Sequence, residues 1–348
     1  MTEGPDRVDL TGERTLTRSL ESVYHAVFFL CAALSVVTTI AIVLTLVINS
    51  ITFFGGYSIV DFLFGTRWIS SRALFGILPL VVSTLLITLG SAVIALPLGV
   101  LTAIYLSEYA SARTRSVLKP LLEILAGVPT VVYGYFALVY VTPALNVVID
   151  GLNAALSTID GALSVVGLGL GFRFAELTMF NLVSASIVVA ILVLPMVSSI
   201  SEDAMGAVPD SLREAGYGLG ATKFEVSTTI VVPAAMSGIT SSFILALSRA
   251  IGETMAVTLA AGMKPLSLPA TKSLFGIPYV SPGQILALYS ESGATMTATI
   301  VDIVTSDLGG GSIAFDAMFA IGLVLFVLTL GMNVISDWIS ARYREVYE

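Results

Sequence analysis

The feature that most constrains this sequence is a set of long stretches without aspartate, glutamate, lysine or arginine. A helix needs about 20 apolar residues to cross the hydrocarbon core of a membrane. Only 11% of the 348 residues are charged and 56% are hydrophobic, whereas a soluble domain carries about 25% charged residues. The sequence therefore predicts an all-α, polytopic membrane protein with six transmembrane helices. The uncharged stretches are Ser22–Val60, Ala73–Ser107, Ile124–Ile149, Leu177–Ser201, Val226–Ser248 and Ala317–Ser336.

Residues that break helices set the expected ends of these spans. The first stretch is too long for one span, and Asn49-Ser50 and Gly55-Gly56 are expected to interrupt it. A short helix at Met296–Val304, lying outside the membrane or re-entering it, is also expected. The six expected spans are Val23–Ile48, Phe75–Leu106, Lys119–Asn146, Asn181–Ile200, Gly238–Gly262 and Phe315–Ser336.

Lysine and arginine set the expected orientation. Six spans place both termini on one side, and the segments on that side carry ten basic residues against five on the other. Because basic residues accumulate in cytoplasmic loops, both termini are expected in the cytoplasm, with the spans in the inner or plasma membrane. The expected organisation is a cytoplasmic tail (1–22), a first helix with its external loop (23–74), a five-span core (75–336) and a second cytoplasmic tail (337–348). The core is expected to include two external loops, 147–180 and 263–314, and a polar cytoplasmic loop, 202–235.

The counts of reactive residues exclude several classes of function. The single cysteine, Cys31, cannot form an intrachain disulfide, and the single histidine, His25, cannot build a histidine-rich metal site. The net charge of −8 argues against nucleic acid as a partner. No G-x4-G-K-[ST] phosphate loop occurs, so the chain cannot bind and hydrolyse ATP by that route, and any energy that it uses has to come from a partner or an ion gradient. We therefore assign this chain no catalytic residue, no metal site and no cofactor of its own.

The polar loop 202–235 contains the most informative local pattern. Ser211-Leu-Arg-Glu214 and Thr222-Lys-Phe-Glu225 are two capping boxes in tandem. Gly220 lies between them, where the end of a helix favours a residue that tolerates positive φ. The pattern predicts a helix, a sharp turn and a second helix.

The composition of the first helix is typical of a helix that another surface approaches closely. Ala215 and Gly216 leave it nearly bare, while Tyr217 and Phe224 flank the turn as aromatic anchors. Such a helix suits a helix-in-groove contact. The caps alone favour a surface hairpin that has no partner, because capping boxes are common.

The same loop resembles a known motif. The loop has Glu214-Ala215-Gly216, then Gly220 after three residues, and Ile230-x-Val232-Pro233 after nine more. It is similar in this to the EAA motif of ABC importer permeases, which has the pattern E-A-A-x3-G-x9-I-x-L-P. The two departures from the pattern, Gly216 and Val232, are conservative. The resemblance implies the type I ABC importer permease fold. It also implies a coupling helix that docks on a separate ATPase subunit. The residues that it assigns to this coupling are Ser211, Glu214, Ala215, Gly216, Tyr217, Gly220 and Phe224.

Two more stretches narrow the resemblance. Leu125–Gly134 and Ser248–Val257 are similar to the permeases of phosphate-specific transport (Pst) systems, the second stretch to their PstC-type subunit. This implies an importer of inorganic phosphate in which the chain pairs, within membrane lipid, with a homologous PstA-like permease. A dimer of PstB-like ATP-binding subunits would carry ATP and Mg, and a PstS-like extracytoplasmic protein would deliver phosphate. The alternatives are a permease for molybdate, sulfate or phosphonate, and an ion-driven secondary transporter.

A charged pair lies inside the fifth expected span. Arg249 and Glu253 are four residues apart and would share one face of a continuous helix. Arg249 would lie about 16 Å from a start at Gly238, near the middle of the membrane. Because intramembrane charge is costly and usually functional, we expect both residues, with Ser248 and Thr254, to line the substrate path. A structural ion pair that joins two helices is the alternative.

Pro129 interrupts the third expected span beside Gly127 and Gly134. A proline removes a backbone hydrogen bond and kinks a helix. A hinge at these three residues and a static packing kink are both compatible with the pattern.

Overall fold

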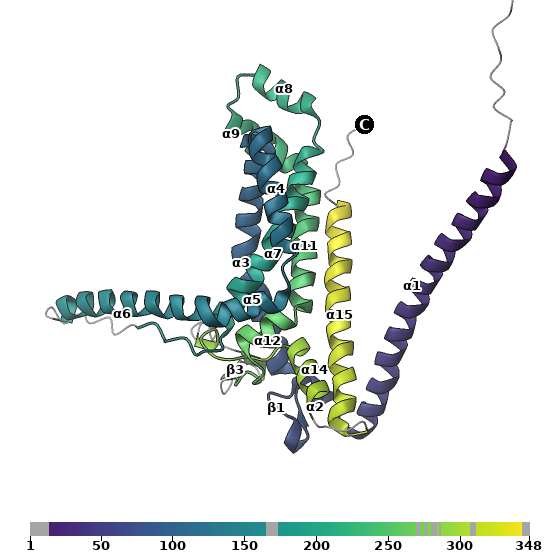
Figure 1. The fold of residues 1–348 in the computed structure, drawn as a ribbon. Helices are drawn as coiled ribbons and strands as arrows, with labels where there is room; N and C mark the ends of the chain where they lie inside the picture. The colour runs from purple at the N-terminus through teal and green to yellow at the C-terminus, as the bar shows by residue number, and fades with distance from the viewer. Residues whose placement is uncertain are drawn as a thin grey trace, which may run out of the picture.

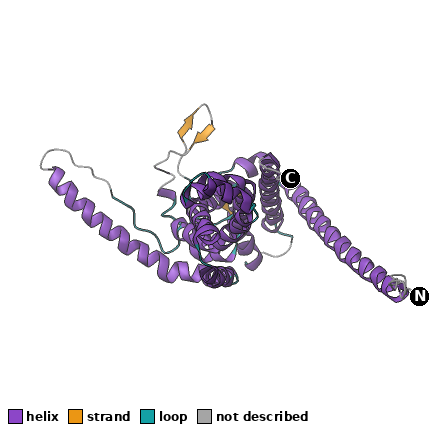
Figure 2. Ribbon diagram, turned by 90° about the horizontal axis from the view of Figure 1, so that it is seen from above, coloured by secondary structure: helices purple, strands orange, loops and turns teal. Residues whose placement is uncertain are grey.

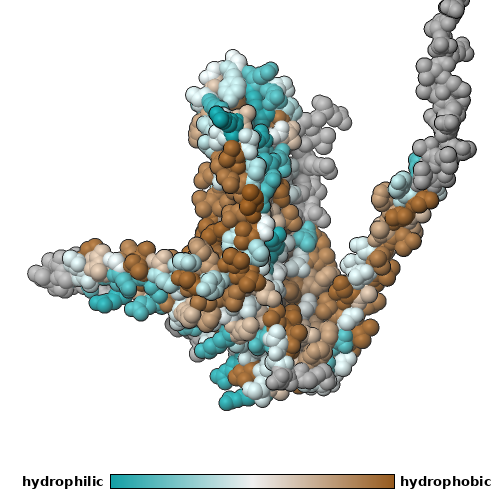
Figure 3. All heavy atoms as spheres, in the orientation of Figure 1, coloured by the Kyte–Doolittle hydropathy of each residue, from teal (hydrophilic) through white to brown (hydrophobic). Residues whose placement is uncertain are grey.

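The computed structural model describes residues 14–164, 173–268, 272–274, 277–279, 284, 287–306 and 311–342. Within these residues, five helices are long and apolar enough to cross a membrane, or six when the bent pair Lys223–Ala234 and Met236–Gly252 counts as one span. The space-filling view shows an apolar belt around the upright helices and a more hydrophilic cap at one end (Figure 3). The predicted all-α, multi-span fold is therefore confirmed.

Helices α3 (Leu78–Ile104) and α7 (Leu182–Gly206) form the centre of the bundle. Their backbones approach closely because α3 presents glycines to α7. A Cβ atom on Gly99 would lie 2.6 Å from Val197 Cγ1. Small residues at such crossings allow the close packing that holds membrane helices together.

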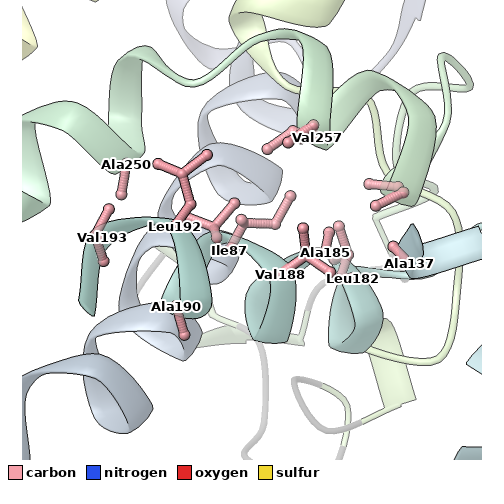
Figure 4. Packing of buried hydrophobic residues seen from close by; sticks show 14 of the residues in the cluster. Ile87, Ala137, Leu182, Ala185, Val188, Ala190, Leu192, Val193, Ala250 and Val257 are labelled. Atoms are coloured by element: carbon pink, nitrogen blue, oxygen red, sulfur yellow. The ribbon is translucent and has the colours of Figure 1, made fainter. Parts of the chain in front are cut away.

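The core around this pair consists of short apolar side chains. Ile87 from α3, Val188 and Leu192 from α7 and Ala250 from α11 belong to one buried cluster and lie close together (Figure 4). Buried hydroxyls in the same helices bond to their own backbone, as Thr84 does to Leu80 O at 2.8 Å. Helices α11 (Met236–Gly252) and α12 (Met255–Ala261) pack on this core.

Helices α1 (Arg14–Gly56) and α15 (Ile313–Arg342) pack together near one end of the molecule. From there α1 leans away from the bundle (Figure 1), and its most apolar window has no residue buried within this chain. The expected break at Asn49-Ser50 is wrong. Asn49 Nδ2 donates to Thr45 O at 2.8 Å, so its side chain bonds within the helix, which continues to Gly56.

An aromatic cluster joins α1 to the short elements at the same end. Phe53 packs edge-on against Phe62 and Phe75 at centroid distances of 5.5 and 5.7 Å. Trp68 pairs with Phe75 across the antiparallel hairpin. The elements involved are α2 (Ile59–Phe64), β1 (Trp68–Ile69), a 3-10 turn (Ser70–Arg72) and β2 (Leu74–Phe75).

The expected third span, Lys119–Asn146, is interrupted beside Pro129, as the sequence predicts, but its bounds are wrong. The helix breaks after Gly127, and the chain then changes direction: α4 lies along the bundle, whereas α6 points away from it crosswise (Figures 1 and 2). The helix also continues past Asn146, whose side chain bonds the returning chain at Leu177 through Nδ2 to O at 3.1 Å. The elements are α4 (Ala112–Ala126), α5 (Thr130–Phe136), a π-helical segment (Ala137–Val141) and α6 (Thr142–Ser164).

The remaining described elements lie in the segment before α15. Helix α14 (Met296–Thr305) confirms the short helix expected at Met296–Val304, and Thr295 caps it by accepting from Ala298 N at 3.2 Å. The strands β3 (Lys272–Leu274) and β4 (Ile277–Tyr279) form an antiparallel hairpin.

Candidate functional site

The polar loop folds into a helical hairpin that protrudes beyond one end of the bundle (Figure 1). Gly220 has φ +84 and makes the turn, as the sequence predicts. Its N–H donates to Tyr217 O at 3.0 Å, and Ala221 N donates to Gly216 O at 3.1 Å, which closes the end of the first helix. The elements of the hairpin are α8 (Asp210–Gly218), α9 (Lys223–Glu225), a π-helical segment (Val226–Val231) and α10 (Val232–Ala234).

One of the two predicted capping boxes is present. Glu225 N donates to Thr222 Oγ1 at 3.3 Å, and Thr222 N donates to Glu225 Oε2 at 2.7 Å. These hydrogen bonds to Thr222 lower the pKa of the Glu225 carboxyl below its ordinary value. The prediction of a capping box at Ser211 is wrong, because α8 begins at Asp210, directly after Pro209, so that Ser211 already lies inside the helix. Pro209 occupies the N-cap position, and no side-chain hydrogen bond caps the start of α8.

The sequence predicts that another surface closely approaches the bare side of the first helix, and at Gly216 that surface belongs to this chain. Gly216 is buried, and a Cβ atom there would lie 2.7 Å from Ile230 Cδ1. The outer side of the hairpin stays open and carries apolar groups: Tyr217, Leu219 and Phe224 are 43%, 91% and 67% exposed. The sequence analysis did not single out Leu219, although its place beside the turn glycine was visible.

Sequence reasoning also missed the residue that attaches α8 to the bundle. Arg213, between Leu212 and Glu214 of the motif, forms a salt bridge with Glu108, with Nη2 3.1 Å from Oε1. Both side chains are mostly buried, at 15% and 5% exposure. The two residues are 105 positions apart, and no local pattern signals such a pair.

A second group of charges joins α4 to the end of α7. The side chain of Glu202 is fully buried and pairs with Arg115, and its Oε2 lies 2.7 Å from Lys119 Nζ. Lys119 also pairs with Asp203 at 2.8 Å. A buried carboxylate is retained only with such partners, so this group fixes α4 against α7 at the end of the bundle that carries α8.

The structure separates Arg249 from Glu253. The expectation of one continuous helix over Gly238–Gly262 is wrong, because α11 ends at Gly252 and Glu253 is extended at φ −66, ψ 129. Two contacts hold this break: Glu253 O accepts from Thr297 Oγ1 at 2.9 Å, and Glu253 Oε1 accepts from Ala256 N at 3.4 Å. Among the described residues, the two charges therefore form no ion pair with each other.

The other residues expected along the substrate path take different positions. Arg249 is exposed on this chain, whereas Glu253 is 9% exposed. Thr254 lies at the helix break and donates to Gly252 O at 3.2 Å. Ser248 instead bonds α15, donating to Asn333 Oδ1 at 2.7 Å.

Two of the three expected hinge residues lie where the direction of the chain changes. Gly127 ends α4, and Pro129 precedes the first residue of α5. Gly134 lies farther along, in close contact with α12: a Cβ atom there would lie 2.8 Å from Leu259 Cβ. The described part of the chain contains no group of three histidine, cysteine or acidic residues that could hold a metal ion.

Comparison with known proteins agrees with this arrangement. Residues 95–345 match the family described as "Binding-protein-dependent transport system inner membrane component". The phosphate transport system permease protein PstC of Haemophilus influenzae is 32% identical over 94% of this chain and 95% of its own length. The probable ABC transporter permease protein YqgH of Bacillus subtilis is 29% identical over 90% and 89%.

A solved structure shares the fold. The bacterial ABC transporter involved in the import of the acidic polysaccharide alginate aligns with a TM-score of 0.50 and 16% identity, over 94% of this chain and 100% of that chain. The family match covers most of the chain, including the hairpin and the helices around it. This multi-pass membrane protein belongs to the family of binding-protein-dependent transport system inner membrane components.

Proposed function

We propose that this chain is the permease subunit of an ATP-driven ABC importer of inorganic phosphate. The observation that carries the proposal is the similarity, over most of the chain, to permeases named for phosphate transport, including those of Haemophilus influenzae and Mesorhizobium japonicum, at 32% and 29% identity. The α8–α9 hairpin supports it, because it presents exposed apolar groups on an otherwise hydrophilic end of the bundle (Figure 3).

The hairpin would couple the chain to a separate ATPase. Tyr217, Leu219 and Phe224 would enter a cleft on a PstB-like subunit, which would carry ATP and Mg. A homologous PstA-like permease would complete the translocation path, and a PstS-like binding protein would deliver phosphate on the opposite side. Since the most apolar window of α1 is unburied within this chain, the surface of that window is free to contact lipid or the second permease.

The substrate path would run beside the α11–α12 break. Arg249 is exposed on this chain, so its guanidinium can meet an anion that passes between two permeases. A planar guanidinium group can donate two parallel hydrogen bonds to two oxygens of one phosphate. Glu253 would keep the empty site from becoming strongly cationic, which would prevent phosphate from binding too tightly to leave.

Both termini would lie in the cytoplasm. The first described residues of α1, the last of α15 and the α8 hairpin all lie at the same end of the bundle (Figure 1). This is the side to which the larger count of basic residues assigns the tails and the loop 202–235. Residues 1–13 and 343–348 of the expected tails lie outside the described residues.

Reconstitution tests the proposal. The permease pair, ATPase dimer and binding protein are placed in proteoliposomes, and uptake of radiolabelled phosphate is followed with ATP supplied on the ATPase side. We expect uptake that requires both ATP and the binding protein and that excess molybdate, sulfate or phosphonate does not suppress. Uptake driven by an ion gradient without ATP, or preference for another oxyanion, would overturn it. An ATPase that binds but cannot hydrolyse ATP is the control.

A further inference from the structure

We propose that Arg213 is the positioning residue that fixes the start of α8 to both α3 and α7, so that movement of the hairpin is passed to this helix pair. The inference rests on the proposed function, because it assumes that an ATPase moves α8. It goes beyond that function by naming the side chain that carries the connection and the residues that receive it.

The guanidinium of Arg213 reaches both central helices at once. Its Nε and Nη2 donate to Glu108 Oε1 at 3.3 and 3.1 Å, and Glu108 lies in the π-helical segment (Tyr105–Tyr109) that directly follows α3. Its Nη2 also donates to Met205 O at 2.8 Å, and its Nη1 donates to Val208 O at 2.6 Å, at the end of α7. One side chain of α8 is therefore bonded to the ends of the two helices that form the core.

Burial makes this connection stiff. Arg213 and Glu108 are 15% and 5% exposed, whereas Asp210, which also pairs with Arg213 at 3.1 Å, is 88% exposed. An exposed ion pair contributes little to stability. Removing one partner of a buried pair, in contrast, leaves an uncompensated charge. Of the two ion pairs, the pair with Glu108 is therefore the one whose loss is expected to let the hairpin move relative to the bundle.

Leu212 of α8 adds apolar packing against the buried cluster that includes Ala103 of α3 and Met205 of α7, but the described residues of α8 make no second polar connection to these helices. Within the described residues, Arg213 is the α8 side chain that bonds another helix, while Glu214 and Ala215 are exposed. The end of the hairpin is held differently, by Lys223 Nζ at 5.2 Å from the Tyr109 ring centroid. A cation–π contact of this kind is weaker and less directional than a forked ion pair.

The first test measures coupling in the reconstituted complex. We compare Arg213→Gln and Glu108→Gln with Arg113→Gln, a matched control because Arg113 is an exposed cation at the same end of the bundle whose side chain forms no ion pair within the described residues. The readout is phosphate taken up per ATP hydrolysed. We expect this ratio to fall about tenfold in the first two variants, within the usual range of coupling between sites, and to stay unchanged in the control.

The second test distinguishes transmission from simple structural support. In a Cys31→Ser background, spin labels at Gly218→Cys on α8 and Leu101→Cys on α3 report the distance between the two elements. We expect a narrow distribution whose mean stays constant when ATP binds, and a broadened one in Arg213→Gln. A wild-type distribution or ratio in Arg213→Gln would overturn the inference. If that variant does not assemble, Glu108→Gln decides by the same two readouts.

The two proposals can fail separately. If the unaltered complex takes up no phosphate with ATP, the proposed function is wrong, and the spin-label distances still decide whether Arg213 joins α8 to α3. If the unaltered complex transports phosphate and the variants keep their ratio and distances, only the role of Arg213 is wrong.

Discussion

At the scale of single residues, the α8–α9 turn depends on Gly220 more than on any neighbour. Its φ of +84 lies in the left-handed region, although a Cβ atom there would meet nothing within 4 Å. A substitution is therefore strained through the backbone, by about 1–2 kcal/mol, and not through crowding. We expect Gly220→Asp to reduce phosphate uptake per ATP hydrolysed, as measured in proteoliposomes. Gly218→Ala, in open space on the helix, is the matched control, and normal coupling in Gly220→Asp would contradict a role for the turn.

The capping box at Thr222 and Glu225 makes the same turn sensitive to acid. The folded-state pKa of Glu225 is lowered by its hydrogen bonds to Thr222. Its contribution is therefore present above the unfolded-state pKa and is lost as pH falls through the folded-state pKa. We expect amide protection over residues 222–225, corrected for intrinsic exchange, to decrease in that acidic range. Glu225→Gln removes this dependence, whereas Glu214→Gln on the neighbouring helix retains it; protection that is constant in acid would refute the assignment.

A substitution of Arg249 is expected to change phosphate uptake without changing the structure of this chain. Its side chain is exposed on this chain, so its loss removes no internal ion pair among the described residues. We expect Arg249→Gln to abolish or greatly slow phosphate uptake while the complex still assembles, because the anion loses its cationic contact in the path. Arg249→Lys retains the charge and is expected to keep part of the activity. Wild-type uptake in Arg249→Gln would leave Arg249 without a role in the path.

At the scale of elements, the contact between α3 and α7 depends on the absence of side chains. A Cβ atom on Gly99 would lie 2.6 Å from Val197 Cγ1, whereas one on Gly331 of α15 would meet nothing within 4 Å. We expect Gly99→Ala to lower the free energy of unfolding by about 1–3 kcal/mol. Gly331→Ala is expected to raise it by up to about 1 kcal/mol through helix propensity. Unfolding in mixed detergent measures both, and equal effects would show that the crossing tolerates a methyl group.

The same scale shows what the sequence could and could not predict. Apolar length predicts most spans, and the turn at Gly220 follows from local chemistry because its hydrogen bonds join near neighbours. The break at Glu253 was not predictable, since Thr297, 44 positions away, holds it. The role of Arg213 was not predictable for the same reason: its partner, Glu108, is distant in the sequence and is brought close by the packing of the helices.

At the scale of the whole molecule, the arrangement of the ends makes the orientation testable. The α8 hairpin and the start of α4 lie at one end of the bundle, and the β1–β2 hairpin lies at the other (Figure 1). The ten-to-five excess of basic residues assigns the α8 end to the cytoplasm. The two ends therefore have to be reached by a water-soluble reagent from opposite sides of the membrane.

Because the chain has a single cysteine, a Cys31→Ser background gives a clean reporter of this topology. Ala112 at the start of α4 and Thr66 before β1 are both exposed. We expect a membrane-impermeant maleimide to label Thr66→Cys in intact cells, and to label Ala112→Cys only after the membrane is opened. Equal labelling of both in intact cells would indicate leaky membranes. The reverse pattern would place α8 outside, where no ATPase could move it, and the coupling proposal would fail together with the orientation.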